Sequence, residues 1–435
     1  MTARNPRRLV LAAGLVGTFA LAACSTSSAE EGGGSADEPV EITWYSYNYG
    51  SASVAGEGTE VLLEAFAEAH PEIKLIPQAV PTADILTKTR ADVAAGNPPD
   101  VVQMGYSKLD EAKKTLPLQP LDEIAGDAWE THTAGINPGL IETGMWEGAP
   151  RSMPYSVSVP ALFYNADIFT EAGLDPDNPP ATAQEVRDAA QQIVDAGYEG
   201  VYYGAIDSGG SDYLTQSVLN SAGTGIVDDA GNITIDSPEA VEALTYLQDL
   251  TLDGLQPAVQ VEDGVGAFNN GDLGMFLATT AYSMSLSAAA EGNFELRSGG
   301  FPTFTDGPAR PTHSGAGLVV LADDPAKQEA AWTFLEFMTS AEGYTIITEE
   351  MGYLPLREDI VEDPDYLADY FAEHTLLIPS LSDLRTVEPY RVFPVENSNR
   401  ATVTFQDNAV EPIMLRGAEV ESTLADVAQQ IRDLG

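Results

Sequence analysis

Aromatic side chains near the predicted ends of strands and at predicted crossovers are the residues of this sequence best suited to binding a solute. An aromatic face packs against the apolar C–H face of a sugar ring, while hydroxyl and carboxylate groups bond to the sugar hydroxyls. For each such residue, packing in a hydrophobic core is the competing interpretation, and Trp44, inside a predicted strand, is expected to be core. The aromatic residues in question are Trp44, Tyr45, Tyr47, Tyr106, Trp146, Tyr155, Tyr282, Tyr353 and Tyr390.

The sequence carries no motif for covalent or cofactor chemistry. It has no Gly-x-Ser-x-Gly nucleophile elbow, no Walker A sequence and no Rossmann glycine fingerprint beside a strand. Its four histidines lie far apart and Cys24 is its only cysteine, so we expect no transition-metal site, no cofactor and no intrachain disulfide. Carboxylates are numerous enough to include a glycosidase acid–base pair, which leaves a secreted glycan-active enzyme as an alternative.

The charge balance excludes two classes of partner. The chain has 67 acidic and 20 basic residues among 435, for a formal net charge of −47. Such a charge repels nucleic acid and anionic lipid headgroups, so binding either of them through a broad basic face is excluded. The length allows two domains with well-buried cores.

An export signal is predicted at the N-terminus. Residues 1–24 combine a basic start, the apolar stretch Leu9–Ala23 and Leu-Ala-Ala-Cys ending at Cys24, which matches the lipobox of bacterial lipoproteins. We therefore expect Cys24 to be lipidated and to anchor the protein on the extracytoplasmic face of the cell membrane. Residues 25–38 have low complexity and are expected to form a flexible tether.

The folded part begins with strands that alternate with amphipathic helices. The predicted strands are Ile42–Tyr47, Ile73–Ile76 and Asp100–Met104, and the helices are Gly58–Ala69 and Asp84–Ala95. This order predicts a parallel sheet with helices on both faces. Ligands of such sheets bind beyond the carboxyl ends of the strands, which places 45–50 and 105–107 at the edge of a cleft.

Further along the chain, capping signals define the next elements. Tyr155–Tyr164 has the composition of a strand, and Asn165 is suited to cap a short helix that ends at Gly173. A second helix is predicted to begin at Thr182, with a capping box completed by Glu185. The remaining predictions are helices over 212–220, 237–253, 282–290, 326–338 and 422–434, a strand over 200–206, and a turn over 228–232.

Several stretches resemble the bacterial extracellular solute-binding proteins that serve ABC importers for sugars and glycerol phosphates. The most specific is Pro-Ala-Leu-Phe-Tyr-Asn-Ala-Asp-Ile-Phe-Thr-Glu-Ala-Gly at 160–173, where the family crosses from one lobe to the other. Others are Ala-Phe-Ala-Glu-Ala-His-Pro-Glu-Ile-Lys-Leu at 65–75, Ala-Ala-Gly-Asn-Pro-Pro-Asp-Val-Val at 94–102 and Gly-Tyr-Leu-Pro at 352–355. Together they cover roughly residues 40–435.

The resemblance implies an α/β architecture, the type II periplasmic-binding-protein-like fold. Each of its two lobes is a mostly parallel sheet with helices on both faces, and crossover strands join the lobes. We expect lobe 1 to comprise 39–153 and 275–324, and lobe 2 to comprise 154–274 and 325–435. The stretch Phe268–Phe276 is expected to return the chain to the first lobe.

The resemblance also implies a ligand site between the lobes. Its expected contacts are Tyr45, Tyr47, Tyr106, Tyr155, Ser156, Ser158, Tyr282, Gly315, Tyr353 and Arg391. In the glycerol-3-phosphate type of the family, the residues matching Tyr353 and Arg391 hold the ligand phosphate, a task that suits the planar guanidinium. The wording around Arg391 departs from that type, and the turn Asp207–Ser211 lacks its tryptophan. A surface or interlobe ion pair is therefore the alternative for Arg391.

We interpret the chain as the substrate-binding component of an ABC importer rather than an enzyme. It is expected to be a monomer that captures a mono- or oligosaccharide, closes by hinge motion and delivers the solute to the membrane permease. Glycerol 3-phosphate or a glycerophosphodiester is the alternative ligand. A glycan-active enzyme and a cell-surface adhesion protein are the alternatives from other classes.

Overall fold

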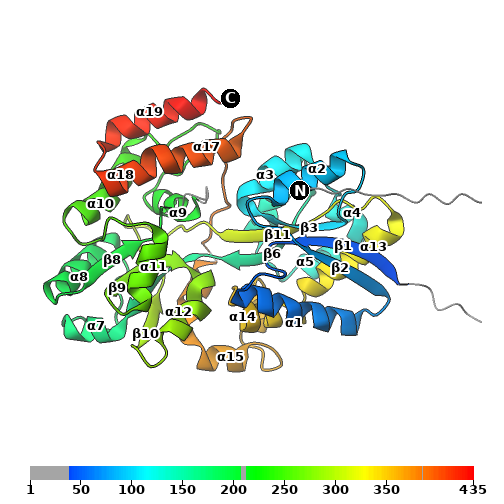
Figure 1. The fold of residues 1–435 in the computed structure, drawn as a ribbon, viewed down its shortest axis with the longest axis horizontal. Helices are drawn as coiled ribbons and strands as arrows, with labels where there is room; N and C mark the ends of the chain where they lie inside the picture. Colours follow the sequence, from blue (N-terminus) through cyan, green and yellow to red (C-terminus); the bar gives the residue numbers. More distant parts are fainter. Residues whose placement is uncertain (1–38, 207–211, 385) are drawn as a thin grey trace, which may run out of the picture. The chain divides into compact units, whose positions relative to one another are not determined.

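Two main β-sheets organise residues 39–206, 212–384 and 386–435, which the computed structural model describes (Figure 1). The first has strand order β2-β1-β3-β11-β6 and the second β10-β7-β9-β8, while β4 and β5 form a small hairpin. The strands are β1 (Val40–Ser46), β2 (Ile73–Ala79), β3 (Val101–Gly105), β4 (Met145–Trp146), β5 (Ala149–Pro150), β6 (Met153–Ser158), β7 (Pro160–Asn165), β8 (Glu199–Tyr203), β9 (Leu273–Thr279), β10 (Leu296–Gly299) and β11 (Ser314–Val320).

The first sheet confirms the predicted parallel start. β1 pairs in parallel with β2 and with β3, and every residue of β3 is buried, as expected of a central strand covered on both faces. β11 runs antiparallel to both β3 and β6, so β6 runs in the same direction as β3. The carboxyl ends of β1, β3 and β6 therefore meet at one edge of the sheet.

The helices on the first sheet come from both ends of the sequence. α1 (Val54–Ala69) begins four residues before its predicted start because the Ser53 side chain caps it by accepting a hydrogen bond from the Gly56 amide. α13 (Pro325–Met338) packs on β1, and α14 (Ala341–Met351) packs on α1. Trp44 is fully buried, with its ring centroid 5.4 Å from that of Phe334, which confirms it as a core residue.

A single residue separates the strands that connect the two sheets. β6 ends at Ser158 in the first sheet and β7 begins at Pro160 in the second, so only Val159 lies between them. The predicted strand over 155–164 is thus two strands, and its expected role as a crossing between sheets is confirmed. Hydrogen bonds in both directions between Val159 and Thr280 fix this crossing against the end of β9.

The second sheet is mixed rather than mostly parallel as expected. β7 is antiparallel to both β9 and β10, and only β8 and β9 pair in parallel. Local capping was predicted well in this part of the chain. Asn165 caps α7 (Ala166–Glu171), and Thr182 with Glu185 forms the capping box of α8 (Ala183–Asp195).

The division of the chain between the sheets differs from the expected boundaries. β9 and β10 lie in the second sheet, so the segment from 275 to 299 does not belong to the first. The reason is packing: β9 is almost wholly apolar and buried between β7 and β8. The chain returns to the first sheet only after β10, through residues 300–313, and not at Phe268–Phe276.

The segment from 325 was also assigned to the wrong core. Buried residues of α13 and α14, and others as far as Leu384, share a hydrophobic cluster with the first sheet. Phe393 and the buried residues that follow it belong to the cluster of the second sheet. The last crossing therefore lies between Leu384 and Phe393 rather than at 325.

The remaining helices complete the layers on the two sheets. They are α2 (Ile85–Ala94), α3 (Tyr106–Thr115), α4 (Leu121–Ala125), α5 (Ala128–Thr133), α6 (Pro138–Thr143), α9 (Tyr213–Ser221), α10 (Pro238–Leu252), α11 (Val261–Asn269), α12 (Ser283–Ala290), α15 (Ala368–Glu373), α16 (Ile378–Asp383), α17 (Ser398–Phe405), α18 (Glu411–Arg416) and α19 (Val420–Arg432). Short 3₁₀ turns lie at Thr280–Tyr282, Glu358–Ile360 and Thr375–Leu377, and a π-helical turn, Gln406–Val410, joins α17 to α18. Within the described ranges, none of these helices has the length and apolar character needed to span a membrane.

Candidate functional site

Most of the predicted site residues lie at one edge of the first sheet. Gly105 opposes Ala316 across the β3–β11 pair, and Gly315 opposes Val157 across the β11–β6 pair. This register brings Tyr106, which follows β3, next to Gly315 and the end of β6. Tyr47 and Asn48 follow β1 at the same edge.

Buried polar groups without partners gather at this edge. Ser46 Oγ donates to Gln103 Oε1 at 2.6 Å and accepts the backbone amides of Asn48 and Tyr49, both at 3.1 Å. These bonds fix the loop after β1 but leave Asn48 Nδ2, Gln103 Nε2 and Ser156 Oγ with no hydrogen-bond partner among the described residues. We call Asn48, Gln103 and Ser156 the Ser156 cluster.

The tyrosines around the Ser156 cluster are held in their neutral form. Burial raises the pKa of Tyr47 and of Tyr353. The Ser156 hydroxyl interacts with both phenols, the Gln103 amide with that of Tyr47 and the Asn48 amide with that of Tyr353. These contacts oppose the rise, but none of them reaches the geometry of a full hydrogen bond. Burial also raises the pKa of Tyr155, whose hydroxyl is likewise unpartnered among the described residues. Hydroxyl and amide groups, and no ionised side chain, therefore make up this part of the edge.

Gly315 is required by its backbone conformation. Its φ of +117° lies in the region that favours glycine, and an added Cβ would clash with the carbonyl oxygen of Ser156. The close approach of β11 to β6 at this point is what brings the ends of the two strands together. Ser158, opposite Ser314, is buried in the same pair of strands.

Residues of the second sheet approach this edge at Gly352, just before Tyr353. Gly352 is the left-handed C-cap of α14, and a Cβ there would lie 2.9 Å from Met284 Cγ and 3.4 Å from Ser283 Oγ. Ser283 begins α12, is buried, and has an unpartnered hydroxyl. The sequence predicted a helix over 282–290 but did not single out Ser283 as a site residue. Tyr282 itself stacks on Phe276, with ring centroids 6.2 Å apart.

Comparison with known proteins decides the class. Residues 50–345 match the family described as bacterial extracellular solute-binding protein. The chain belongs to this family.

Relatives and solved structures agree with that assignment. A binding protein of Brucella abortus (strain 2308) is 26% identical over 95% of both chains. The sn-glycerol-3-phosphate-binding periplasmic protein UgpB of Salmonella typhimurium is 25% identical, over 73% of this chain and 75% of its own. The cyclic α-maltosyl-1,6-maltose binding protein of Arthrobacter globiformis has a TM-score of 0.77 at 25% identity, and the match covers 90% of this chain and 98% of that one.

These findings make the protein a non-catalytic solute-binding protein of the ABC-importer type for sugars or glycerophosphates. Such proteins bind small-molecule substrates and deliver them to permeases. The extracellular family and its periplasmic relatives place the protein on the extracytoplasmic side.

Arg391 lies apart from the Ser156 cluster in this solute-binding protein. With Tyr106 it lines a cavity of about 280 Å³, whose lining also includes Asp110, Asp228 and Asp229. Its guanidinium is 3.5 Å from Asp229, and the side chain is 46% exposed. We call this the Arg391 cavity.

The backbone of Arg391 is held by a buried amide. Gln216 accepts the Arg391 amide at 3.2 Å and donates to its carbonyl at 3.0 Å, while the hydroxyl of the preceding Tyr390 donates to Asp212. These bonds come from α9 and its first flanking residue. The segment around Arg391 is therefore fixed by the second sheet's helices.

His313 packs against two residues that line the Arg391 cavity, Tyr106 and Thr143. Its ring packs edge-on against Tyr106 with centroids 4.5 Å apart, and its Nε2 is 3.1 Å from Thr143 Oγ1. Complete burial lowers the pKa of His313 to about 3, so the imidazole is neutral. Tyr106 is also buried, which raises the pKa of its phenol.

Some predicted contacts have local structural roles. The Tyr45 hydroxyl donates to Asp92 at 2.8 Å and accepts from Lys88 at 3.1 Å, both on α2. Trp146 lies beneath the Lys113 ammonium, 5.9 Å from its ring centroid, in the β4–β5 hairpin. The turn Asp207–Ser211 and Cys24 lie outside the described residues. Within the described ranges no group of three or more His, Cys, Asp and Glu side chains could hold a metal ion.

Proposed function

We propose that this protein captures a neutral carbohydrate at the Ser156 cluster and delivers it to the permease of an ABC importer. The observation that carries the proposal is the set of three buried groups, Asn48 Nδ2, Gln103 Nε2 and Ser156 Oγ, that lack partners among the described residues. Leaving a buried donor unsatisfied costs about 1–3 kcal/mol, so a ligand that supplies acceptors there would bind with that cost removed.

A neutral polyol matches the chemistry of these groups. Amides and hydroxyls can both donate to and accept from sugar hydroxyls, and the nearby tyrosines stay protonated because burial raises their pKa. The similarity to a maltosaccharide-binding protein supports the same class of ligand.

A glycerol phosphate is the second candidate. The similarity to a glycerol-3-phosphate-binding protein favours it, as does the presence of Tyr353 and Arg391. Electrostatics oppose it, because the cavity's two cations, Arg391 and Lys113, face three carboxylates, Asp110, Asp228 and Asp229, and Arg391 is already 3.5 Å from Asp229. A phosphate there would face more negative than positive charge.

Solute binding would couple the two sheets through their crossings. These are Val159, residues 300–313 and the segment from Leu384 to Phe393. A solute that contacts the Ser156 cluster from one side and Tyr282 from the other stabilises the closed arrangement, which the permease recognises.

We further propose that the protein is a monomer anchored by a lipid on Cys24, with residues 25–38 as tether. Replacing Cys24 with serine should move the protein from the membrane fraction to the aqueous fraction of cells. Unchanged fractionation would exclude the anchor.

The ligand class is tested by calorimetric titration and thermal shift with saccharides, glycerol 3-phosphate and glycerophosphocholine. A ligand that binds only the folded state stabilises it and so raises the melting temperature. At a free ligand concentration of a hundred times Kd, the added stability is about 2.7 kcal/mol. Response to a neutral saccharide alone supports the proposal. Response to the phosphates alone, abolished in Arg391→Ala, would replace it with the second candidate.

A further inference from the structure

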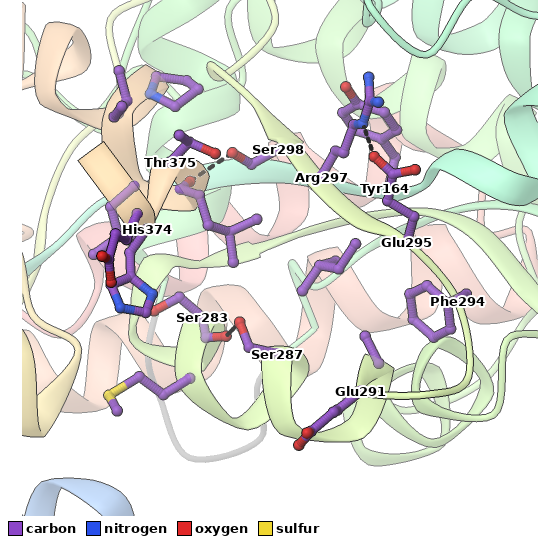
Figure 2. A pocket seen from close by; sticks show the side chains of 18 of the residues that line it. Tyr164, Ser283, Ser287, Glu291, Phe294, Glu295, Arg297, Ser298, His374 and Thr375 are labelled. Atoms are coloured by element: carbon purple, nitrogen blue, oxygen red, sulfur yellow. Dashed lines mark hydrogen bonds and ion pairs between the residues drawn. The ribbon is translucent and has the colours of Figure 1, made fainter. Parts of the chain in front are cut away.

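A second, larger cavity includes residues of α12 and shares no lining residue with the Arg391 cavity. Its volume is about 1010 Å³, and its walls come from α12, β10 and the segment from α14 to α16 (Figure 2). We call it the α12 cavity. Volumes of this size are typical of sites for organic ligands rather than of packing defects.

Carboxylates dominate the charge of the α12 cavity. Glu291, Glu295, Glu349 and Glu373 line it. Among the described residues only Glu295 of these four makes an ion pair, through Arg297. Burial raises the pKa of Glu349, the charge of the adjacent Glu350 adds to this effect, and the charge of His374, which also lines the cavity, opposes it.

The cation in the cavity is already neutralised. Arg297 Nη1 is 2.6 Å from Asp177 and its Nε is 2.6 Å from Glu295, the pair visible in Figure 2. These partners raise the pKa of the guanidinium still further. Three carboxylates therefore face the cavity with no cation within ion-pair distance in the described ranges, and such a concave acidic wall concentrates positive charge.

Apolar and aromatic groups complete the lining. Phe294, Leu296 and Leu376 offer partly buried apolar surface. The rings of Tyr370 and His374 pack on each other with centroids 4.5 Å apart and planes tilted by 32°. At the α12 end, the buried Ser283 hydroxyl has no partner among the described residues, and it is a polar group that a ligand can satisfy.

We propose that the α12 cavity is a second binding site, for a small organic cation that joins an amine to an apolar or aromatic body. The amine is held by Glu349 and Glu373, and the body packs on the aromatic and apolar walls, where an ammonium gains further from the ring faces.

Occupancy of this site would affect both cores. Met351 and Phe371, from the elements on one side, are buried with the first sheet, while Leu286 of α12 is buried with the second. A ligand between these elements contacts groups that belong to both, so it would bias their relative arrangement independently of the transported solute.

The test uses three probes of the same shape and different charge: benzylamine, benzyl alcohol and benzoate. Each is titrated into the purified protein at 150 mM salt and followed by ligand-observed NMR, with and without a saccharide that binds in the calorimetric titration. We expect benzylamine to bind at least about tenfold more tightly than benzyl alcohol, with no detectable binding of benzoate, and saccharide not to displace it.

Matched variants locate the site. Glu349→Gln with Glu373→Gln should weaken benzylamine binding about tenfold. Glu329→Gln with Glu362→Gln removes the same charge outside the cavity and should leave benzylamine binding unchanged. Equal binding of the amine and the alcohol would overturn the proposal, and so would equal loss in both variants, since attraction to the whole acidic chain would then suffice. The melting temperatures of both variants serve as the check on folding.

Discussion

The Ser156 cluster and the Arg391 cavity are two polar regions close to the same sheet edge, and they differ in whether their polar groups already have hydrogen-bond or ion-pair partners. Asn48, Gln103 and Ser156 are buried, uncharged and short of partners. Arg391 is half-exposed, has Asp229 nearby, and has its backbone held by Gln216. Unsatisfied buried groups gain more from a ligand than exposed paired charges do, because solvent and counter-charge already serve the latter. The contrast directs the search for solute contacts to the neutral region.

The largest effect on the Ser156 cluster is expected from a change in the backbone next to it. Gly315→Ala adds a Cβ that clashes with the Ser156 carbonyl and forces an alanine into φ of +117°. We expect a loss of stability of about 2–4 kcal/mol and loss of measurable solute binding. Urea unfolding and calorimetric titration measure the two effects. Full stability in this variant would show that β11 and β6 separate easily.

Lowering the pH should destabilise the protein through the buried, neutral His313. Burial lowers the pKa of His313 from 6.5 to about 3, so protons prefer the unfolded chain. The stability that the neutral imidazole contributes is complete above pH 6.5 and is lost as the pH falls toward 3, by up to about 4 kcal/mol.

The control for this prediction is His313→Phe, whose unfolding free energy should fall less between pH 6.5 and 4. Asp383 acts in the opposite sense, since burial raises its pKa to about 6 and protonation then favours the folded state. Because Asp383 is present in both proteins, the difference between them isolates His313. Parallel pH curves would mean that the imidazole is solvated.

A smaller and cleaner change tests the Ser156 hydroxyl. Ser156→Ala removes a group that has no hydrogen bond to lose in the unliganded protein, so the unfolding free energy should change by less than about 0.5 kcal/mol. Solute affinity should nevertheless fall about tenfold, as expected for one lost hydrogen bond. Equal affinity in the variant and the parent would remove Ser156 from the site.

The smallest effect is expected in the charged region. Arg391→Ala should change saccharide affinity less than about threefold, because the side chain is exposed and pairs with Asp229. Calorimetric titration of this variant and of Ser156→Ala compares directly how much each region contributes to saccharide affinity. A larger loss for Arg391→Ala than for Ser156→Ala would reverse our comparison.

Local signals in the sequence predicted the elements well. Asn165, Thr182 and Glu185 act on amides within a few residues of themselves, so their capping roles follow from spacing alone. The sequence did not predict correctly on which sheet each helix packs. α13 has an apolar face that would suit either core, and only tertiary packing places it on β1.

The sequence predicted the sheet edge at which the candidate site lies, but it did not predict all of the residues that form it. Tyr106 and Gly315 lie where the strand-end rule and the family resemblance place them. Gln103 and Asn48 were missed because an amide near the end of a strand looks the same in sequence whether its donors are satisfied or orphaned. That distinction arises because Ser46 bonds only to the side-chain oxygen of Gln103 and to the backbone amide of Asn48, while burial removes water from the side-chain donors of both residues.

The lone residue between β6 and β7 has a mechanical consequence. Only Val159 lies between two hydrogen-bonded strands, so any rotation of one sheet against the other must be absorbed by very few backbone torsions at this point. Val159 therefore acts as a pivot rather than as a flexible linker. Displacement grows with distance from a pivot. In the closure that we propose, Ser156 and Ser158, within three residues of Val159, would therefore move little, while elements far from Val159 would move further. The solute contacts next to the pivot can keep their geometry while the rest of the molecule moves around them.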